Sequence, residues 1–280
     1  MSIEKGALYI VATPLGNLAD ITARALDVLR EVDVVAAEDT RHSRSLLAHF
    51  GIDTPMLSLH EHNEHAAMTA VLKRLAASAS VALISDAGTP LISDPGFPLV
   101  RAAREQGYAV IPIPGACAAI AALSVGGLPT DRFVFEGFLP AKSQARLSRL
   151  AALQRETRTL VFYESTHRIS AVLADMAAIF GATREAVVAR EMTKLYEDIR
   201  SGAIGTLAQH FSDSAQCKGE FVVLVAGAAE QQDDDFARAE EILVALLEDL
   251  PVKKAVALAV RLTAVSKNWL YDRALQLKNK

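Results

Sequence analysis

Cysteine is scarce in this chain of 280 residues, which has only Cys117 and Cys217 and no CxxC pair. This scarcity excludes a four-cysteine zinc site and a scaffold held by several disulfides. It is typical of a reduced compartment, so we expect a cytoplasmic location. Residues 1–12 lack a basic stretch followed by a long apolar run, so we expect no signal peptide.

Several common catalytic motifs are also missing. The sequence has no GxGxxG, no GxxxxGK[ST] and no GxSxG, which excludes a Rossmann dinucleotide fingerprint, a P-loop and a serine-hydrolase elbow. The histidine-rich run at 60–65 matches neither HExxH nor HxxEH. We therefore expect no metal, and we expect these histidines either to contact substrate or to face solvent.

Charged residues are absent from residues 106–130, a length that could cross a membrane as a helix. Prolines and glycines interrupt it, however, at positions 112, 114, 115, 126, 127 and 129. Because these residues break a helix, the segment reads as a strand, a turn and a short helix. We expect no membrane span.

The charge is unevenly distributed along the chain. The net charge is −4, yet residues 251–280 carry seven basic side chains and only one acidic one, Asp272. Two readings stay open: an interaction module for an anionic partner, or a solvated helix face balanced by the acids near residues 233–235.

Short β-branched runs alternate with amphipathic helical stretches, which predicts an α/β fold with parallel or mixed sheets. Strands are expected at 7–12, 32–37, 81–85, 108–111, 133–136, 159–163, 186–189, 197–200 and 220–225. Helices are expected at 21–30, 66–77, 142–155, 166–180, 234–249, 252–262 and 267–277. The last two, joined by a short break, resemble a helix-turn-helix unit. We therefore divide the chain into an α/β domain at 1–126, a second α/β domain at 127–228 and a basic helical segment at 229–280.

Long loops rich in Gly, Pro, Thr and Asp follow the expected strands. The loop at 85–96 contains two glycines and two prolines, and it exposes backbone groups at the carboxyl edge of the sheet, where open α/β folds bind ligands. The helix start after Pro114-Gly115 has almost no side chains, so a flat ligand could lie against it. Tight packing is the other reading there, and Cys117 alone is more typical of a small buried residue than of a nucleophile.

Eight motifs in a fixed order carry a resemblance to a known family. They are TPLGNL at 13–18, EDTR at 38–41, HEHNE at 60–64, the loop 85–96, FEGFLP at 135–140, FYESTHR at 162–168, AREMTK at 189–194 and GE at 219–220. Together they resemble the bacterial small-subunit ribosomal RNA cytidine 2′-O-methyltransferases of the tetrapyrrole methylase superfamily, from about residue 5 to the C-terminus. Thr166, Ala116 and Met192 depart from the usual family residues, and none of these changes removes a chemically unique group.

The resemblance implies two tetrapyrrole-methylase-like α/β domains with S-adenosylmethionine bound in the cleft between them, a small C-terminal helical segment, and a homodimer. No metal is needed, because the donor carries its own activated methyl group. Carried over to this chain, the expected donor-binding residues are Asp86, Gly88, Thr89, Pro90, Ser93, Cys117, Ala118, Ala189 and Glu191.

A ribose 2′-hydroxyl is a poor nucleophile, so a base or an orienting group must sit beside it. Asp39, His62 and Lys194 are the expected catalytic residues, with Glu61 and Glu191 as further candidates. Cationic and histidine side chains suit contacts with phosphate. Those expected to bind RNA are Arg41, His42, Arg168, Arg190, Lys253, Lys254 and Lys267, and surface ion pairs are their alternative role.

Three functions fit these observations, and the first is the leading one. The first is S-adenosylmethionine-dependent 2′-O-methylation of a cytidine in 16S ribosomal RNA, as naked RNA or in the 30S subunit. The second is a small-molecule methylase acting on a tetrapyrrole-type substrate. The third is a catalytically silent RNA-binding protein. The basic C-terminal helices and the polar 60–65 loop favour RNA over a porphyrin-like substrate.

Overall fold

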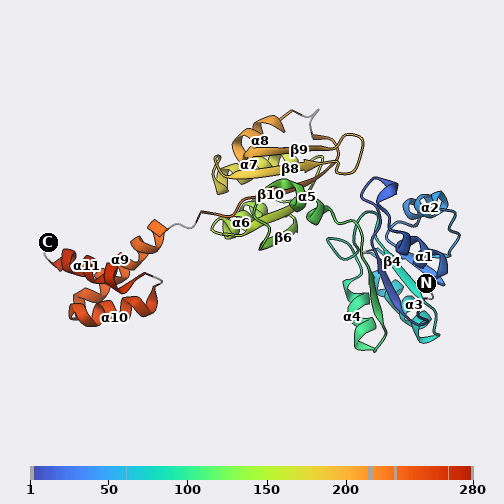
Figure 1. Ribbon diagram of the computed structural model, residues 1–280, viewed down its shortest axis with the longest axis horizontal. Coiled ribbons are helices and arrows are strands. Elements are labelled where there is room, and N and C mark those ends of the chain that lie inside the picture. Colours follow the sequence, from blue (N-terminus) through green and yellow to red (C-terminus); the bar gives the residue numbers. More distant parts are fainter. Residues whose placement is uncertain (1–2, 61, 214–216, 230–231, 264, 279–280) are drawn as a thin grey trace. The chain divides into compact units, whose positions relative to one another are not determined.

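The computed structural model describes residues 3–60, 62–213, 217–229, 232–263 and 265–278. Its chain forms two compact units, Met1–Gly227 and Ala228–Lys280, and the first unit contains two five-stranded sheets (Figure 1). The α/β fold predicted from the sequence is confirmed.

The first sheet is parallel and has the strand order β3-β2-β4-β1-β5. Its strands are β1 (Leu8–Val11), β2 (Val34–Ala37), β3 (Met56–Ser58), β4 (Val81–Ile84) and β5 (Val110–Ile113). Helices α1 (Ala23–Glu31) and α2 (Thr40–His49) cover one face, while α3 (Glu64–Ala76) and α4 (Phe97–Glu105) cover the other. Because all five strands run the same way, the loops after β1, β2 and β4 meet at one edge.

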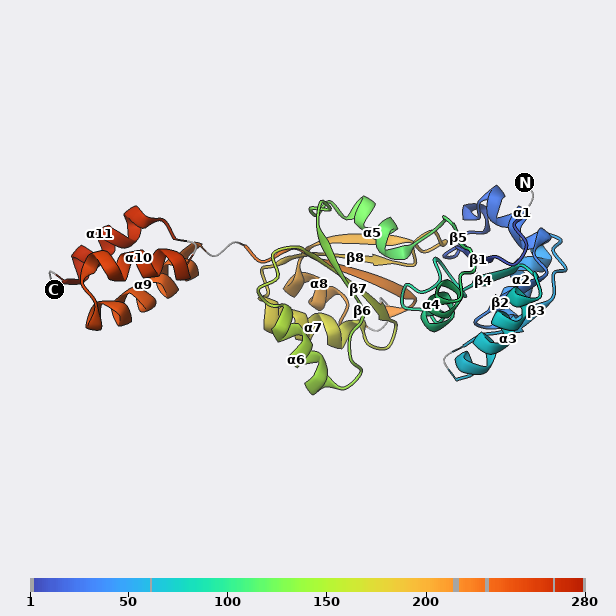
Figure 2. The same ribbon diagram turned by 90° about the horizontal axis from the view of Figure 1, so that it is seen from below.

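The second sheet is mixed and has the order β6-β7-β10-β8-β9. Its strands are β6 (Phe133–Phe138), β7 (Thr159–Ser165), β8 (Glu185–Arg190), β9 (Asp198–Ala203) and β10 (Glu220–Val225). Only β6 and β7 pair in parallel, and the other pairs are antiparallel. Figure 2 shows this sheet beside the first within the same unit. The sequence predicted parallel or mixed sheets, and this second sheet is mixed.

Side chains of the second sheet alternate between two buried clusters, as period-two strands require. One cluster packs under α6 (Ser143–Leu153), α7 (Ile169–Phe180) and α8 (Ile204–His210), and the other packs under α5 (Ala118–Gly126). Helix α5 thus covers the second face of this sheet, although in the chain it follows β5 of the first sheet. The expected boundary after Gly126 stays an interpretation, because the two sheets belong to one compact unit.

Residues 106–130 follow α4 and contain a turn, strand β5 and helix α5, as their prolines and glycines predicted. Throughout the described ranges, every helix is too short or too polar to cross a bilayer.

The second unit is a small helical domain with its own core. Helices α9 (Gln232–Asp249), α10 (Val252–Leu262) and α11 (Lys267–Lys278) enclose buried residues such as Leu243, Val256 and Leu270. Lys253, Lys254 and Lys267 are exposed, whereas Arg273 makes a two-pronged ion pair with Glu240 at 2.6 and 2.8 Å. The positive charge open to a partner is therefore mainly that of the lysines and of the exposed Arg261.

Three elements were not predicted from the sequence. Strand β3 has only three residues and is half-buried, so it lacks a long β-branched run. In α2 the only large aliphatic residues are Leu46 and Leu47, which leaves no helical period to detect. Helix α4 carries a proline in its first turn, where the missing N–H costs nothing.

Candidate functional site

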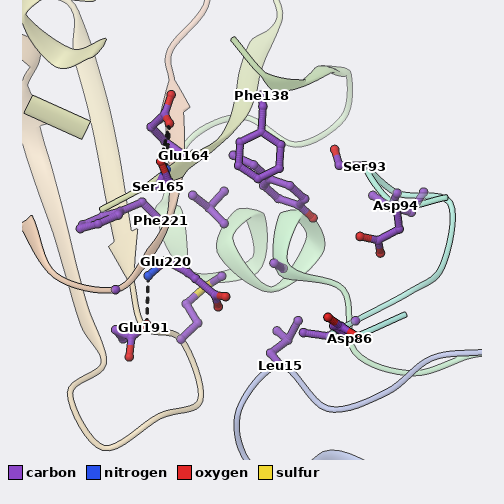
Figure 3. A pocket seen from close by; sticks show the side chains of 18 of the residues that line it. Leu15, Asp86, Ser93, Asp94, Phe138, Glu164, Ser165, Glu191, Glu220 and Phe221 are labelled. Carbon is purple, nitrogen blue, oxygen red and sulfur yellow. Dashed lines mark hydrogen bonds between the residues drawn. The ribbon is translucent and has the colours of Figure 1, made fainter. Parts of the chain in front are cut away.

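A cavity of about 670 Å³ lies in the first unit, where both sheets contribute the ends of their strands. Its volume lies within the range of about 300–1,000 Å³ that is usual for ligand pockets. Leu15 after β1, Glu38 after β2 and the loop after β4 form one side, and the ends of β7 and β8 with the start of β10 form the other. Figure 3 shows the two sides facing each other, with Asp86 and Asp94 opposite Glu191 and Glu220.

The loop after β4 is held in a constrained conformation. The backbones of Gly88 and Thr13 exchange hydrogen bonds of 2.8 and 3.1 Å, and Thr89 Oγ1 donates to the Ala116 carbonyl at 2.9 Å. Leu91 and Ser93 have φ of 72° and 69°, which is strained for residues other than glycine. Such strain persists only where the surroundings enforce it, and it clusters at functional sites.

The start of α5 forms the floor between the two sides. Cys117 and Ala118 line the cavity, and the Ala119 N–H donates to the Tyr163 hydroxyl at 3.1 Å. Burial raises the pKa of the Tyr163 hydroxyl above its usual range, and the nearby Cys117 adds to this shift. Tyr163 therefore stays protonated and ties the second sheet to the helix start.

The first-sheet side of the cavity is acidic. Burial raises the pKa of Asp94 to about 6; a hydrogen bond from Ser85 opposes this shift, and the negative charges of Glu38 and Asp86 add to it. Asp86 Oδ1 also accepts the Asp39 N–H at 3.1 Å. In the described ranges no salt bridge neutralises Asp86 or Asp94, so this side is complementary to a cationic ligand.

The second-sheet side contains a lysine held by two carboxylates. Lys194 Nζ lies 2.9 Å from both Glu191 Oε1 and Glu220 Oε2. Burial alone would lower the pKa of Lys194, but the hydrogen bonds to Glu220 and Glu191 outweigh it and raise that pKa. The Lys194 stem occupies the space where a Cβ at Gly16 would lie, so this charged side chain reaches the loop after β1.

Buried Glu164 in β7 and half-buried Arg168 form an ion pair at the edge of the cavity. Ser165 N–H donates to Glu164 Oε1 at 2.8 Å, and Arg168 Nε lies 3.3 Å from the same oxygen. Burial raises the pKa of Glu164, against the hydrogen bond from Ser165 and the charge of Arg168. Arg168 also donates to the Leu139 carbonyl at 2.6 Å. Its guanidinium is thus engaged within the protein, and a phosphate contact by Arg168 stays a prediction.

Most of the residues expected to bind the donor do meet in this cavity. Those that line it are Asp86, Gly88, Thr89, Ser93, Cys117, Ala118 and Glu191. Pro90 is buried in the same loop, and Ala189 is buried in β8 beneath the cavity, packed in the cluster under α5. Their roles in donor binding stay predictions.

The expected catalytic residues are dispersed. Lys194 lines the cavity, whereas Asp39 and His62 do not. Asp39 begins α2, and the Arg41 N–H that it accepts at 2.8 Å lowers the pKa of its carboxyl, which weakens it as a base. His62 is exposed in the turn before α3. Glu61 lies outside the described residues.

The expected RNA-binding side chains fall into two groups. Arg41 and His42 are exposed in the first turn of α2, and Arg190 at the end of β8 donates to the Lys218 carbonyl at 2.7 Å. Lys253, Lys254 and Lys267 belong to the helical unit. No group of three or more metal-binding side chains occurs in the described parts of the chain.

The sequence reasoning missed three aspects of the cavity: Asp94 on the acidic side, Tyr163 beneath α5, and the start of β10. Asp94 stands in the loop 85–96, which the sequence predicted to bind a ligand. Its position directly after Ser93, an expected donor-binding residue, could have indicated a role in the same site. Tyr163 and Phe221 come from strands distant in the chain, so only pairing of β7 with β10 brings them here.

Comparison with known proteins identifies the relatives of this chain. Residues 7–208 match the family of tetrapyrrole (corrin/porphyrin) methylases, and residues 233–278 match the RsmI C-terminal HTH domain. The chain is 57% identical to ribosomal RNA small subunit methyltransferase I of Pseudomonas aeruginosa, over 99% of this chain and 100% of that protein. It is 52% identical to the protein of the same name from Escherichia coli O157:H7, over 98% and 96%.

Solved structures share the fold at low sequence identity. A diphthine synthase has a TM-score of 0.61 at 18% identity, covering 79% of this chain and 90% of its own. The cobalt precorrin-4 methyltransferase CbiF has a TM-score of 0.59 at 17% identity, covering 81% and 98%. The resemblance seen in the eight sequence motifs is thus confirmed. The chain belongs to the tetrapyrrole (corrin/porphyrin) methylase family and, within it, to the group of ribosomal RNA small subunit methyltransferase I proteins.

Proposed function

We propose that this chain transfers a methyl group from S-adenosylmethionine to the 2′-oxygen of a cytidine ribose in 16S ribosomal RNA. The observation that carries the proposal is the 57% identity, across nearly the whole chain, to a ribosomal RNA small subunit methyltransferase. The HTH match at residues 233–278 supports an RNA substrate as well.

The test is to map methylated nucleotides by mass spectrometry in small-subunit RNA from cells with and without this protein. In parallel, the purified chain is given labelled donor with stripped 16S RNA or with 30S particles. The proposal predicts one cytidine 2′-O-methyl group that depends on the protein. The proposal is contradicted if cells without the protein keep every methyl group and the purified chain transfers none in vitro.

The residues around the cavity fit the proposed donor. Gly88 has φ of 87° and no side chain, so backbone can approach a ligand there, and Ala118 and Thr89 keep the lining small. The donor's sulfonium is a cation, and Asp86 and Asp94 offer negative charge on the same side. When bound, the donor supplies an activated methyl group, which needs no metal for its transfer.

The chain's own task in this reaction is to bind, orient and exclude water. Tyr163 and the Thr89–Ala116 hydrogen bond fix the floor of the cavity. Lys194 stays protonated at neutral pH, because the glutamates beside it raise its pKa. We therefore assign Lys194 the orienting of the acceptor through its ammonium group, rather than removal of a proton. Asp39 and His62 stay candidates for the base.

A small-molecule substrate has less support. The corrin and porphyrin enzymes resemble this chain only at 16–20% identity, which speaks for a shared fold and not for a shared substrate. They also cover at most 81% of this chain. Transfer to a tetrapyrrole but not to RNA would favour this alternative.

Donor affinity should depend on pH through Asp94. Asp94 is ionised above its pKa of about 6 and neutral below it, and the ionised form favours the cationic donor. Between pH 7.5 and 5.0 we expect donor affinity to fall about tenfold, the size of a charge-assisted contact. Calorimetry across this range measures it.

The matched comparison for this pH effect uses two asparagine variants. Asp94→Asn should bind the donor weakly at every pH, with the dependence near pH 6 removed. Asp131→Asn, at an exposed carboxylate, should behave as the wild type. An unaltered pH profile in Asp94→Asn would show that Asp94 is not the source of the dependence.

The helical unit should supply RNA affinity rather than chemistry. Binding of polyanions is driven by counterion release, with a slope of about −0.7 in log K against log salt for each contact to single-stranded RNA. Lys253→Gln with Lys254→Gln should therefore weaken RNA binding and flatten this slope by about 1.4. Lys5→Gln with Lys73→Gln, also at exposed positions, should change neither quantity. Equal slopes in the two double variants would indicate a solvated face.

We further propose that the protein acts as a homodimer in the cytoplasm. The family resemblance supports the dimer, and helix α5 exposes Ile120 and Val125, at 54% and 55%, to which a second copy could bind. The cytoplasmic location is supported by the proposed substrate, because ribosomal RNA is found in the cytoplasm. Sedimentation at several concentrations measures the dimer, and a monomer at all of them would contradict it.

A further inference from the structure

The loop between β8 and β9, residues 191–197, presents two apolar side chains to solvent. Leu195 is 87% exposed and Tyr196 is 70% exposed, the two highest values among the large hydrophobic residues of the described chain. A single exposed hydrophobic residue needs no explanation, but an adjacent pair at a loop tip offers a contact surface.

This loop is held in place by its own backbone and charges. Thr193 N–H donates to Glu197 Oε2 at 2.6 Å, and Lys194 N–H donates to the Glu191 carbonyl at 3.0 Å. Glu191 and Thr193 have φ of 50° and 69°. Strained backbone of this kind is kept where a defined shape is useful, and a preformed loop loses little entropy on binding.

The tip is continuous with the candidate active site. Glu191, Met192 and Lys194 of the same loop line the cavity, and Figure 3 shows Glu191 on its second-sheet side. Tyr196 stands only two positions after Lys194 in the chain, so a group bound to Tyr196 would lie near the cavity wall.

Residues 190–200 and 218–220 carry four basic and four acidic side chains, and two of the basic ones stand outside the ion pairs of the described chain. Lys194 pairs with both Glu191 and Glu220, and Arg200 pairs with Asp198 at 2.6 Å. Among the described residues, Arg190 and the exposed Lys218 form no ion pair. An aromatic tip beside free cations suits an unpaired nucleotide, whose base stacks while its phosphate meets the cations.

We propose that Leu195 and Tyr196 form a stacking platform for an unpaired base of the RNA substrate, next to the nucleotide that enters the cavity. This inference rests on the proposed function, and it assigns a further substrate contact to the tip of the loop that carries Lys194. In this proposal Tyr196 supplies the ring face, Leu195 adds apolar surface beside it in the chain, and Arg190 and Lys218 are the cations that meet the phosphates.

The test compares Tyr196→Ala, Tyr196→Phe and Phe133→Ala in methyl transfer to 30S particles or 16S RNA. Loss of one stacked base is worth about 1–3 kcal/mol, so Tyr196→Ala should raise KM for RNA by about 5- to 150-fold, with kcat and donor affinity unchanged. Tyr196→Phe keeps the ring face and should restore the wild-type KM. Phe133, 38% exposed, stands at the opposite end of β6 from Phe138 of the cavity, and its variant should be neutral.

A wild-type KM in Tyr196→Ala, with the wild-type enzyme active, overturns the platform and leaves the proposed function intact. A raised KM that accompanies dissociation of a dimer, seen by sedimentation, also overturns it and assigns the tip to contact between copies. If the wild-type chain methylates no RNA, the proposed function fails. The platform is then judged by binding of an unpaired oligonucleotide, which Tyr196→Ala must weaken for the platform to stand.

Discussion

Gly88→Arg is expected to abolish binding of S-adenosylmethionine. Gly88 is buried at the cavity wall between Leu15 and Ala116, and a Cβ there would lie 3.2 Å from Leu15 Cδ2. Because Gly88 lines the cavity, we expect a long side chain at this point to enter it and fill the space that we assign to the donor. Calorimetric titration with the donor measures the loss, and circular dichroism checks that the fold persists.

Gly88→Ala is the control for backbone strain at this position. Its φ of 87° is unfavourable for any residue with a Cβ, at a cost of about 1–3 kcal/mol in stability. Both variants carry this cost, but only arginine fills the cavity. Alanine should therefore keep measurable donor binding. Wild-type donor affinity in Gly88→Arg would move the donor site out of the loop after β4.

Lys194→Ala is expected to reduce methyl transfer strongly while donor binding stays nearly intact. The ammonium group is the cation that lines the cavity wall between Glu191 and Glu220, and its removal leaves two carboxylates facing the acceptor. An orienting or proton-transferring group is worth about 10²–10⁴ in rate. Single-turnover transfer to 30S particles at saturating donor and RNA measures this step.

Three further variants sharpen this prediction. Lys194→Arg keeps the charge and should retain more activity than alanine. Asp39→Ala and His62→Ala carry the same expectation of slow transfer, although neither side chain lines the cavity. Loss of transfer in His62→Ala, with transfer kept in Asp39→Ala, would mark the imidazole as the base. Near-normal turnover in Lys194→Ala, Asp39→Ala and His62→Ala alike would place the acceptor pocket elsewhere, around residues 163–168.

Much of the fold follows from local sequence patterns. Strands such as 81–85 and 220–225 are short apolar runs, and the glycine- and proline-rich loops after them cannot continue a strand or a helix. The loop at 85–96 was expected to bind a ligand for this reason, and its residues Asp86, Gly88, Thr89 and Ser93 do line the cavity. The basic end of the chain was equally visible, because residues 251–280 carry seven basic side chains and only one acidic one.

Elements without a strong local pattern could not be predicted in this way. Strand β3 is stabilised by pairing with β2 through Val35–Met56 and its neighbours, and the energy of such pairing depends on a partner that local sequence does not specify. Helix α2 depends on its Asp39 cap and on Leu47 packing under the first sheet.

Local sequence thus decided which segments become strands, helices and ligand-binding loops, since backbone propensity, hydrophobic period and turn chemistry act over a few residues. Only the tertiary structure decided which loops meet. Tyr163 reaches α5 because β7 pairs with β10 and α5 packs across that sheet. Lys194 rather than Asp39 or His62 faces the cavity because the strained turn after β8 directs it toward Gly16. The shifted pKa of Asp94 has the same origin, because burial and the charges of Glu38 and Asp86 act through space and not along the chain.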